Sequence, residues 1–314
     1  MNTVLIVCSC VFGACLVLSY VLYRYAFIRG KEPVPPVPGT GKTEARRFFS
    51  EHYAERMSYL ERWGYETVTV TNFQGKRLVG YLFRAKRSTD RVALCIHGYR
   101  NAAFNEYLYH APMYLEHLGM DLLLVDDQAH GASEGKRIGF SWNDRRDCLQ
   151  WVDWITGHMG PDKEVLLQGI SMGAATVLNA AGESSLSANV RWVVADCAFS
   201  SLKVEILQAM KQRFHLPAFP LYYMASGFCR LFNGFFCGTA DVAKQTAKIK
   251  VPVLFIHGGE DRFVPTEMVH TLYEACNTPK DLLIVPSAWH GESFLLEPET
   301  YESMIRKLLE KGDG

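Results

Sequence analysis

The stretch LLQGISMGAAT, from Leu166 to Thr176, decides how the rest of this sequence is interpreted. An apolar run ends in Gly169, Ser171 follows two residues later, and Gly173 precedes a series of small, helix-forming residues. A sharp strand-to-helix turn needs neighbours without side chains, and such a turn presents a serine hydroxyl above a sheet. The helix N-terminus would offer its N–H groups to a developing anion. Ser171 is therefore the candidate nucleophile, and a glycine-rich turn that merely opens a helix is the alternative.

The rest of the chain repeats the same alternation of strand and helix. From Arg91 onward the strand-like segments are continuously apolar, which is typical of parallel strands buried on both faces. The expected strands are ETVTV, RLVGYLF, RVALCIHG, DLLLVDD, EVLLQG, RWVVADC, VPVLFIHG and DLLIVP. The expected helices cover about 103–118, 144–158, 171–182, 265–277 and 298–309. This pattern predicts an α/β fold with a mostly parallel eight-stranded sheet, helices on both faces, and functional groups at the carboxyl ends of the strands.

One connection is too long for a simple crossover. Residues 199–248 are rich in aromatic side chains and separate two of the expected strands. We interpret them as a helical cap over the strand ends. The alternative is a plain buried helical insertion. The main domain is expected to cover residues 48–314.

The first thirty residues have a different composition. From Thr3 to Tyr23 no residue is charged, and about 20 apolar residues are what a helix needs to cross a bilayer. Residues 1–30 are therefore predicted to be an uncleaved, single-pass transmembrane anchor, because a positive region and a cleavage site typical of a signal peptide are missing. Positive residues such as Arg24, Arg29 and Lys31 follow the apolar segment, which favours a cytoplasmic main domain. Residues 31–47, rich in proline and glycine, are expected to be a linker that holds this domain off the membrane.

Composition excludes several classes of function. The formal net charge of the 314 residues is zero, so no basic surface argues for nucleic acid. Nine scattered cysteines do not form a disulfide framework in a chain of this length. Cys229 and Cys237 are close enough in sequence to form a bridge, although two buried thiols are the simpler expectation.

A serine hydroxyl attacks a carbonyl only when a base removes its proton, so a histidine and an orienting carboxylate are expected. His290 follows the last strand and Asp261 follows the strand before it, in the chain order serine, acid, histidine. Asp196, at the end of an earlier strand, is the competing acid, and Glu260 is a weaker alternative. The expected base is His290, with Asp261 as its partner.

An acyl-transfer site also needs donors for the oxyanion of the tetrahedral intermediate. The backbone N–H of Tyr99 follows a strand that ends in His97 and Gly98, and the N–H of Met172 follows the candidate nucleophile. The loop DDQAHGASEG is expected to be scaffold, with His130 or Ser133 as alternatives for contact with substrate.

Taken together, the motifs HGYRN, DDQAHGASEG, GISMG, GGEDRFVP and AWHGE occur in the order found in the α/β-hydrolase superfamily. The chain resembles its bacterial membrane-anchored branch of serine-aminopeptidase-like or lysophospholipase-like enzymes. This resemblance implies the α/β-hydrolase fold, with Ser171 as nucleophile, Asp261 as acid and His290 as base, and with Tyr99 and Met172 as oxyanion donors. Relatives often have an arginine near Gln128, which this chain lacks.

The function expected from these features is hydrolysis of a carboxylic ester, thioester or amide of an apolar or acyl substrate. Peptidase activity, acyl transfer and ligand binding without turnover are the alternatives. No motif for a metal, nucleotide or dinucleotide is present, so no cofactor is expected. Expected partners are a small acyl substrate and the membrane, without nucleic acid or an obligate protein partner.

Overall fold

The computed structural model describes residues 2–31 and 34–311, so residues 32–33 of the predicted linker lie outside the described part. The strands are β1 (Glu66–Thr71), β2 (Arg77–Phe83), β3 (Arg91–Ile96), β4 (Asp121–Asp126), β5 (Glu164–Ile170), β6 (Val190–Asp196), β7 (Val253–Gly258) and β8 (Lys280–Val285). The helices are α1 (Asn2–Phe27), α2 (Glu44–Trp63), α3 (Ala103–Tyr107), the π-helix η1 (Met113–His117), α4 (Asp144–His158), α5 (Met172–Ala181), α6 (Leu202–Gln212), α7 (Leu221–Asn233), the 3₁₀ helix η2 (Cys237–Thr239), α8 (Val242–Thr246), α9 (Glu267–Ala275), α10 (Ser293–Leu296) and α11 (Pro298–Glu310).

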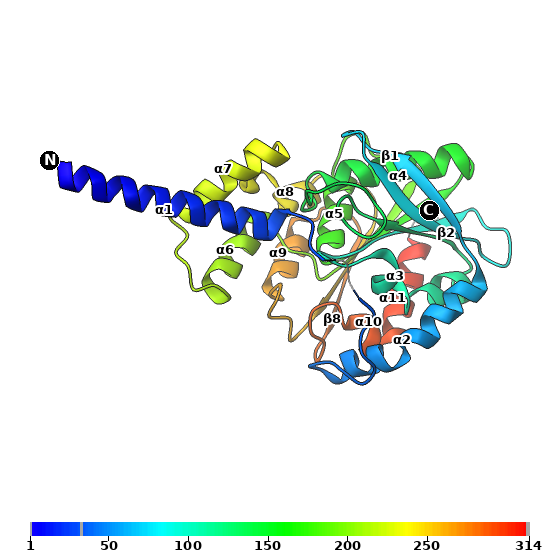
Figure 1. Ribbon diagram of the computed structural model, residues 1–314. Coiled ribbons are helices and arrows are strands. Elements are labelled where there is room, and N and C mark those ends of the chain that lie inside the picture. Colours follow the sequence, from blue (N-terminus) through cyan, green and yellow to red (C-terminus); the bar gives the residue numbers. More distant parts are fainter. Residues whose placement is uncertain (1, 32–33, 312–314) are drawn as a thin grey trace.

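The strands form a single sheet in the order β1-β2-β4-β3-β5-β6-β7-β8 (Figure 1). Strands β1 and β2 pair antiparallel, β2 pairs antiparallel with β4, and all other neighbours are parallel. The predicted eight-stranded, mostly parallel sheet is confirmed. Its parallel strands all end at the same edge, where the loops after β3, β5, β7 and β8 meet.

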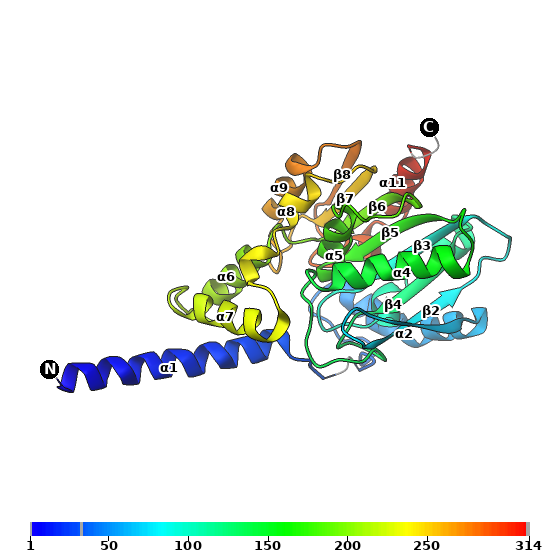
Figure 2. The ribbon, with the colours of Figure 1, turned by 90° about the horizontal axis from the view of Figure 1, so that it is seen from above.

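Each face of the sheet has its own hydrophobic core. In β3 the side chains of Val92 and Leu94 belong to one core, and those of Ala93 and Cys95 belong to the other. The first core includes residues of α4, α5 and α9, and the second includes residues of α2, α3 and α11. Figure 2 shows α4 and α5 on one side of the sheet. Burial on both faces explains why the parallel strands are apolar throughout.

Two helical segments differ from the predicted pattern. The helix expected over 103–118 is interrupted, with α3 ending at Tyr107 and η1 beginning at Met113. Pro112 lies at this break, and proline has no N–H for a helical hydrogen bond. Helix α2, which was not predicted, begins at Glu44 inside the expected linker, with the Thr43 hydroxyl accepting from the Arg46 N–H.

Helix α1 projects from the body, and its C-terminal part lies along the cap helices α6 and α7 (Figures 1 and 2). Residues 3–27 are, by length and composition, the one helix in the described ranges that could cross a membrane, and a signal sequence meets the same criteria. The C-terminal part of α1 packs against the domain. The buried side chains of Ser19, Tyr23 and Phe27 form a stripe, four residues apart, that faces the rest of the protein.

Candidate active site

Ser171 lies on a strained turn between β5 and α5. Its backbone has φ 58° and ψ −116°, a conformation that residues other than glycine rarely adopt. The Ser171 N–H donates to the Asp196 carbonyl oxygen at 2.8 Å, which ties the turn to the neighbouring strand. The strand, turn and helix predicted around Ser171 are all present.

The glycines around this turn are required by close backbone approaches. A Cβ atom on Gly173 would lie 2.0 Å from the Ile96 carbonyl oxygen, and one on Gly169 would lie 2.1 Å from the Gly173 carbonyl oxygen. Both distances are impossible contacts between backbone atoms and a methyl group. A Cβ on Gly98 would lie 3.3 Å from the Ser171 Cβ, so the loop after β3 passes directly beside the serine.

The structure brings Ser171, His290 and Asp261 into one hydrogen-bonded chain. The Ser171 hydroxyl lies 2.8 Å from His290 Nε2, and His290 Nδ1 lies 2.7 Å from Asp261 Oδ2. The three residues come from the loops after β5, β8 and β7, so they meet only because the strands are parallel. This arrangement lets Nε2 receive the serine proton while the carboxylate orients the ring.

Asp261 is held as a carboxylate by its surroundings. Burial alone raises its pKa, but hydrogen bonds from His257 and His290 outweigh burial and hold the pKa well below its usual range. The other oxygen, Oδ1, accepts from the backbone N–H groups of Phe263 and Val264 at 2.8 and 3.0 Å. His257 Nε2 lies 3.3 Å from Asp261 Oδ2, a contact that the sequence did not reveal.

The competing acids occupy different positions. Asp196 is buried, and its Oδ1 lies 3.5 Å from the Ser293 hydroxyl instead of contacting His290. Burial raises the pKa of Asp196 to about 6 despite the opposing effect of nearby histidines. Glu260 is exposed and lies 3.7 Å from Arg262. The geometry thus pairs His290 with Asp261.

The two expected oxyanion donors are available. Within residues 2–31 and 34–311, the backbone N–H groups of Tyr99 and Met172 have no hydrogen-bond acceptor. Met172 begins α5, so its N–H lies at a helix N-terminus. Both residues line the same pocket as Ser171. Free donors beside the serine are what an oxyanion site requires.

The histidines of the neighbouring loops hold the backbone in place. His97 Nε2 accepts from the Asp127 N–H at 3.0 Å, and His130 Nε2 accepts from the Arg100 N–H at 3.1 Å. Burial lowers the pKa of His130 well below its usual value, which keeps the ring neutral. Ser133 is buried and donates to the Asp126 carbonyl oxygen. Neither His130 nor Ser133 lines the pocket beside Ser171, which favours the scaffold interpretation.

Helix α2 secures the loop that carries His290. The Arg46 guanidinium donates to the His290 carbonyl oxygen at 2.9 Å and forms an ion pair with the buried carboxylate of Glu292 at 3.2 Å. The Thr43 hydroxyl donates to the same carboxylate at 2.6 Å. The N-cap motif at Thr43 was the available signal for this helix, but nothing in the sequence indicated its contact with His290.

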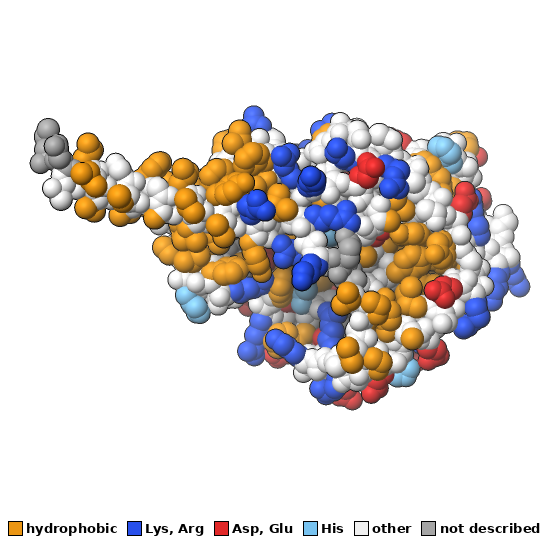
Figure 3. All heavy atoms as spheres, in the orientation of Figure 1, with side chains coloured by type: hydrophobic (Ala, Val, Ile, Leu, Met, Phe, Trp, Pro, Cys, Tyr) orange, Lys and Arg blue, Asp and Glu red, His pale blue; other side chains and the backbone are white. Residues whose placement is uncertain are grey.

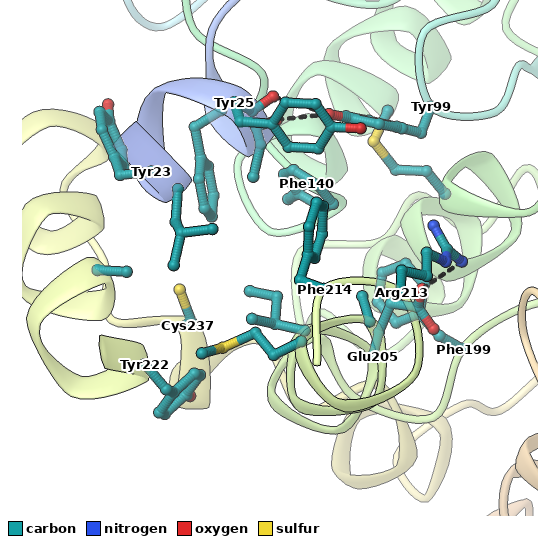
Figure 4. Close-up of a pocket in the computed structure, with 18 of the residues that line it drawn as sticks. Tyr23, Tyr25, Tyr99, Phe140, Phe199, Glu205, Arg213, Phe214, Tyr222 and Cys237 are labelled. Carbon is teal, nitrogen blue, oxygen red and sulfur yellow. Dashed lines mark hydrogen bonds and ion pairs between the residues drawn. The ribbon is translucent and has the colours of Figure 1, made fainter. Parts of the chain in front are cut away.

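An apolar pocket of about 120 Å³ extends from Ser171 and Met172 between α1, α6 and α7 (Figure 4). Its walls include Phe140, Phe199 and Phe214, together with Tyr23 and Tyr25 of α1. Few polar groups line this pocket, as is typical of sites for small molecules. The aromatic insertion thus covers the strand ends as expected, and α1 unexpectedly completes the pocket.

One acidic residue in this pocket was missed in the sequence. Glu205 of α6 lies 3.9 Å from Arg213, and its buried Oε2 has no hydrogen-bond partner among the residues that the structure describes. Burial raises the pKa of Glu205 to about 7, although Arg213 and His290 oppose this effect. Figure 4 shows the Glu205 and Arg213 side chains together at one end of the pocket.

The site offers poor ligands for a metal ion. Ligand atoms of Cys197, Asp261 and His290 lie within 4.8 Å of one another. Both ring nitrogens of His290 already lie within hydrogen-bonding distance of Ser171 and Asp261, and burial raises the pKa of the Cys197 thiol well above its usual value. A metal prefers the thiolate, which this environment disfavours. Cys229 and Cys237 are free thiols.

Sequence comparisons agree with this architecture. Residues 206–299 match the family model described as serine aminopeptidase, S33, a range that contains Asp261 and His290. The chain is 27% identical over 236 residues to the uncharacterized protein YqkD of Bacillus subtilis, covering 75% of this chain and 76% of YqkD. It is 24% identical over 234 residues to the uncharacterized protein YfhR of Escherichia coli K12, covering 74% and 75% of the two chains.

Solved structures give the same result for the fold. The Pyrococcus furiosus esterase Pf2001 superimposes with a TM-score of 0.65 at 23% identity, covering 91% of this chain and all of the esterase. Est1E of Butyrivibrio proteoclasticus, solved with ferulic acid, superimposes with a TM-score of 0.62 at 19% identity, covering 78% of this chain and all of Est1E. With the sheet order and the strand-turn-helix at Ser171, these similarities show that the chain has the α/β-hydrolase fold.

Proposed function

We propose that this protein is a membrane-anchored serine hydrolase that cleaves carboxylic esters of apolar acyl groups. The observation that carries the proposal is the continuous chain from the Ser171 hydroxyl through His290 to Asp261, with distances of 2.8 and 2.7 Å. The adjacent apolar pocket supports an acyl substrate, and the esterase structures with the same fold support an ester.

In the proposed mechanism, His290 Nε2 takes the Ser171 proton as the serine oxygen attacks the substrate carbonyl. The resulting oxyanion is stabilised by the N–H groups of Tyr99 and Met172. Protonated His290 then donates its proton to the departing alcohol, leaving an acyl group on Ser171. A water molecule, deprotonated by His290, attacks this acyl-enzyme, and the carboxylic acid and free serine are regenerated. Asp261 stabilises the imidazolium in both steps.

The proposed anchor is α1. Its C-terminal part is integrated into the domain, because the Tyr99 hydroxyl donates to the Ala26 carbonyl oxygen at 2.9 Å and the Ile138 N–H donates to that of Phe27 at 2.8 Å. Removal of α1 as a signal peptide would expose the pocket wall, which supports retention of the helix. We propose the cytoplasmic side for the main domain from the positive residues that follow the apolar segment.

The central test is a Ser171→Ala variant of the full chain. We expect it to lose labelling by a fluorophosphonate probe and to lose hydrolysis of p-nitrophenyl butyrate by on the order of 10⁴- to 10⁶-fold, while its thermal unfolding is unchanged. The exposed Ser303→Ala is a matched control that should label normally. Labelling that persists in Ser171→Ala would remove this serine from the mechanism.

The orientation is tested with protease in intact cells that express the full chain. A cytoplasmic domain remains intact until the membrane is permeabilised. Digestion before permeabilisation would overturn the proposed orientation and leave the hydrolase mechanism untouched.

Glu205 favours a second candidate function, hydrolysis of an aminoacyl amide. An acidic side chain with an unpartnered oxygen could bind a substrate ammonium group beside Ser171. If amides with a free amino group are the substrate, Glu205→Gln will lower kcat/KM for an aminoacyl p-nitroanilide by at least about tenfold without a similar loss for p-nitrophenyl butyrate. Equal changes in kcat/KM for the two substrates would favour ester hydrolysis as the function.

A further inference from the structure

The apolar pocket at Ser171 is closed on one side by the predicted anchor itself. Leu22, Tyr23, Tyr25, Ala26 and Phe27 of α1 line the same cavity as Ser171. In Figure 4 the end of α1 crosses the top of the pocket, with the rings of Tyr23 and Tyr25 beside it. A tether that only held the enzyme at a membrane would have no reason to contribute the wall of its site.

The position of α1 is set by directional contacts as well as by packing. The Tyr23 hydroxyl donates to Asn233 Oδ1 at 2.7 Å, and Asn233 Nδ2 donates to the Ile138 carbonyl oxygen at 2.9 Å. Beyond the helix, the Arg29 N–H donates to the Lys136 carbonyl oxygen at 2.9 Å. These bonds fix the rotation and depth of α1 against the cap and the body.

Aromatic contacts connect α1 to the oxyanion loop. The rings of Phe27 and Phe140 lie 4.8 Å apart, and those of Phe140 and Tyr99 lie 5.0 Å apart. The Tyr99 hydroxyl also donates to the Ala26 carbonyl oxygen. The residue expected to stabilise the oxyanion therefore rests against the anchor.

The outer surface of the same region is apolar. On α1 the side chains of residues such as Val4, Leu5 and Val17 are exposed, and on the cap Phe219, Tyr223 and Leu231 are each at least 60% exposed. Figure 3 shows hydrophobic side chains gathered along α1 and over the adjacent part of the cap. Such a surface is typical of contact with lipid, so in the proposed membrane-anchored enzyme the pocket lies beside the bilayer.

We propose that the domain-facing side of α1 is a specificity-determining wall of the acyl pocket, and that the substrate is a single-chain acyl ester drawn from the lipid around the anchor. This inference rests on the proposed esterase function. The acyl chain lies between α1 and the cap helices α6 and α7, with its carbonyl carbon at Ser171. The side chains of α1 that face the acyl chain then set the length of acyl chain that the pocket accepts.

The test compares the same substitution at two places on α1 in the full chain, in detergent micelles. Ala26 lines the pocket, whereas Ala14 is exposed on the same helix and does not. We compare kcat/KM for p-nitrophenyl palmitate with kcat/KM for p-nitrophenyl butyrate. In Ala26→Trp this palmitate-to-butyrate ratio is expected to fall at least about tenfold, because the indole ring fills part of the pocket. Ala14→Trp is expected to keep the ratio of the unaltered chain.

A second variant protects the test against misfolding. Leu22 is only partly buried, so Leu22→Ala enlarges the pocket at little cost to stability, and the preferred acyl chain is expected to lengthen. Fluorophosphonate labelling of each variant reports whether the Ser171 site is intact. A palmitate-to-butyrate ratio unchanged in both pocket variants, with normal labelling, would overturn the role of α1 and leave the esterase proposal standing. Absence of ester turnover by the unaltered chain would overturn the esterase proposal and this inference together.

Discussion

The candidate site has two walls that are built in different ways. The wall on the sheet side, called the polar wall below, carries Ser171, Asp261 and His290 on loops after parallel strands, and directional hydrogen bonds hold each group. The opposite wall, called the apolar wall below, comes from α1, α6 and α7, and mostly apolar side chains of these helices face the pocket. Hydrogen bonds lose their strength with small changes in geometry, whereas apolar contact scales with buried area. We therefore expect changes in the first wall to abolish activity and changes in the second to adjust selectivity.

The largest expected effect separates the two aspartates of the polar wall. Asp261→Asn removes the charge that orients His290, and a comparable change in a serine protease lowers kcat about 10⁴-fold. Asp196→Asn is expected to change kcat by less than about tenfold, because the ring nitrogens of His290 are paired with Asp261 and Ser171 and Asp196 lies near Ser293. Steady-state hydrolysis of p-nitrophenyl butyrate measures both. The assignment is wrong if the Asp196 variant is the more damaged of the two.

A second prediction concerns the backbone contacts beneath the polar wall. Gly173→Ala places a methyl group 2.0 Å from the Ile96 carbonyl oxygen, so the free energy of unfolding should fall by about 3 kcal/mol or more. Gly157→Ala is the control, since its added Cβ in α4 would meet no described atom within 4 Å beyond the adjoining backbone of its own helix, and alanine there should stabilise by about 0.5–1 kcal/mol. Urea denaturation of both variants gives the comparison. Equal stability of the two would contradict the role of this close approach.

A third prediction tests whether α2 supports the polar wall. Arg46→Ala removes the donor to the His290 carbonyl oxygen, and kcat should fall between about 10- and 100-fold because the imidazole is displaced. The exposed neighbour Arg47→Ala should behave as the unaltered enzyme. A merely structural role for Arg46 would lower stability without changing kcat at temperatures where the protein is folded.

The smallest effect concerns buried carboxyls behind the polar wall. Burial, with the nearby charge of Asp144, raises the pKa of Asp147 to about 8, although the Asn72 amide opposes this shift. A raised pKa means that the folded state keeps a proton that the unfolded state releases above about pH 4. The free energy of unfolding should therefore fall as the pH rises from about 4 to about 8.

Asp147→Asn keeps the shape of the side chain and removes its titration. Between pH 5 and pH 8 both proteins should lose stability. The free energy of unfolding should fall by on the order of 2 kcal/mol more in the unaltered chain than in Asp147→Asn. The remaining slope comes from neighbouring groups, including Asp127, whose pKa is also raised by burial. Denaturation curves at four pH values measure this difference, and parallel pH dependences would contradict it.

Much of the polar wall could be predicted because its signals are local. A strand, a glycine pair and a helix-forming run specify the turn at Ser171, and the positions of Asp261 and His290 follow from strand ends that parallel pairing brings together. The apolar wall had no comparable signal. Ser19, Tyr23 and Phe27 belong to a segment that is hydrophobic all round, so its periodicity does not show which side faces protein.

The sequence by itself determined the order of strands and helices along the chain, the strained turn at Ser171 and the chain positions of its expected partners. These features follow from hydrophobic period and from residues with special backbone requirements, which act over a few positions. The tertiary structure alone decided that His257 also contacts Asp261, that Arg46 holds the His290 loop, and that α1 closes the pocket. Each of these depends on packing between segments far apart in the chain, where nothing local distinguishes one apolar or charged neighbour from another.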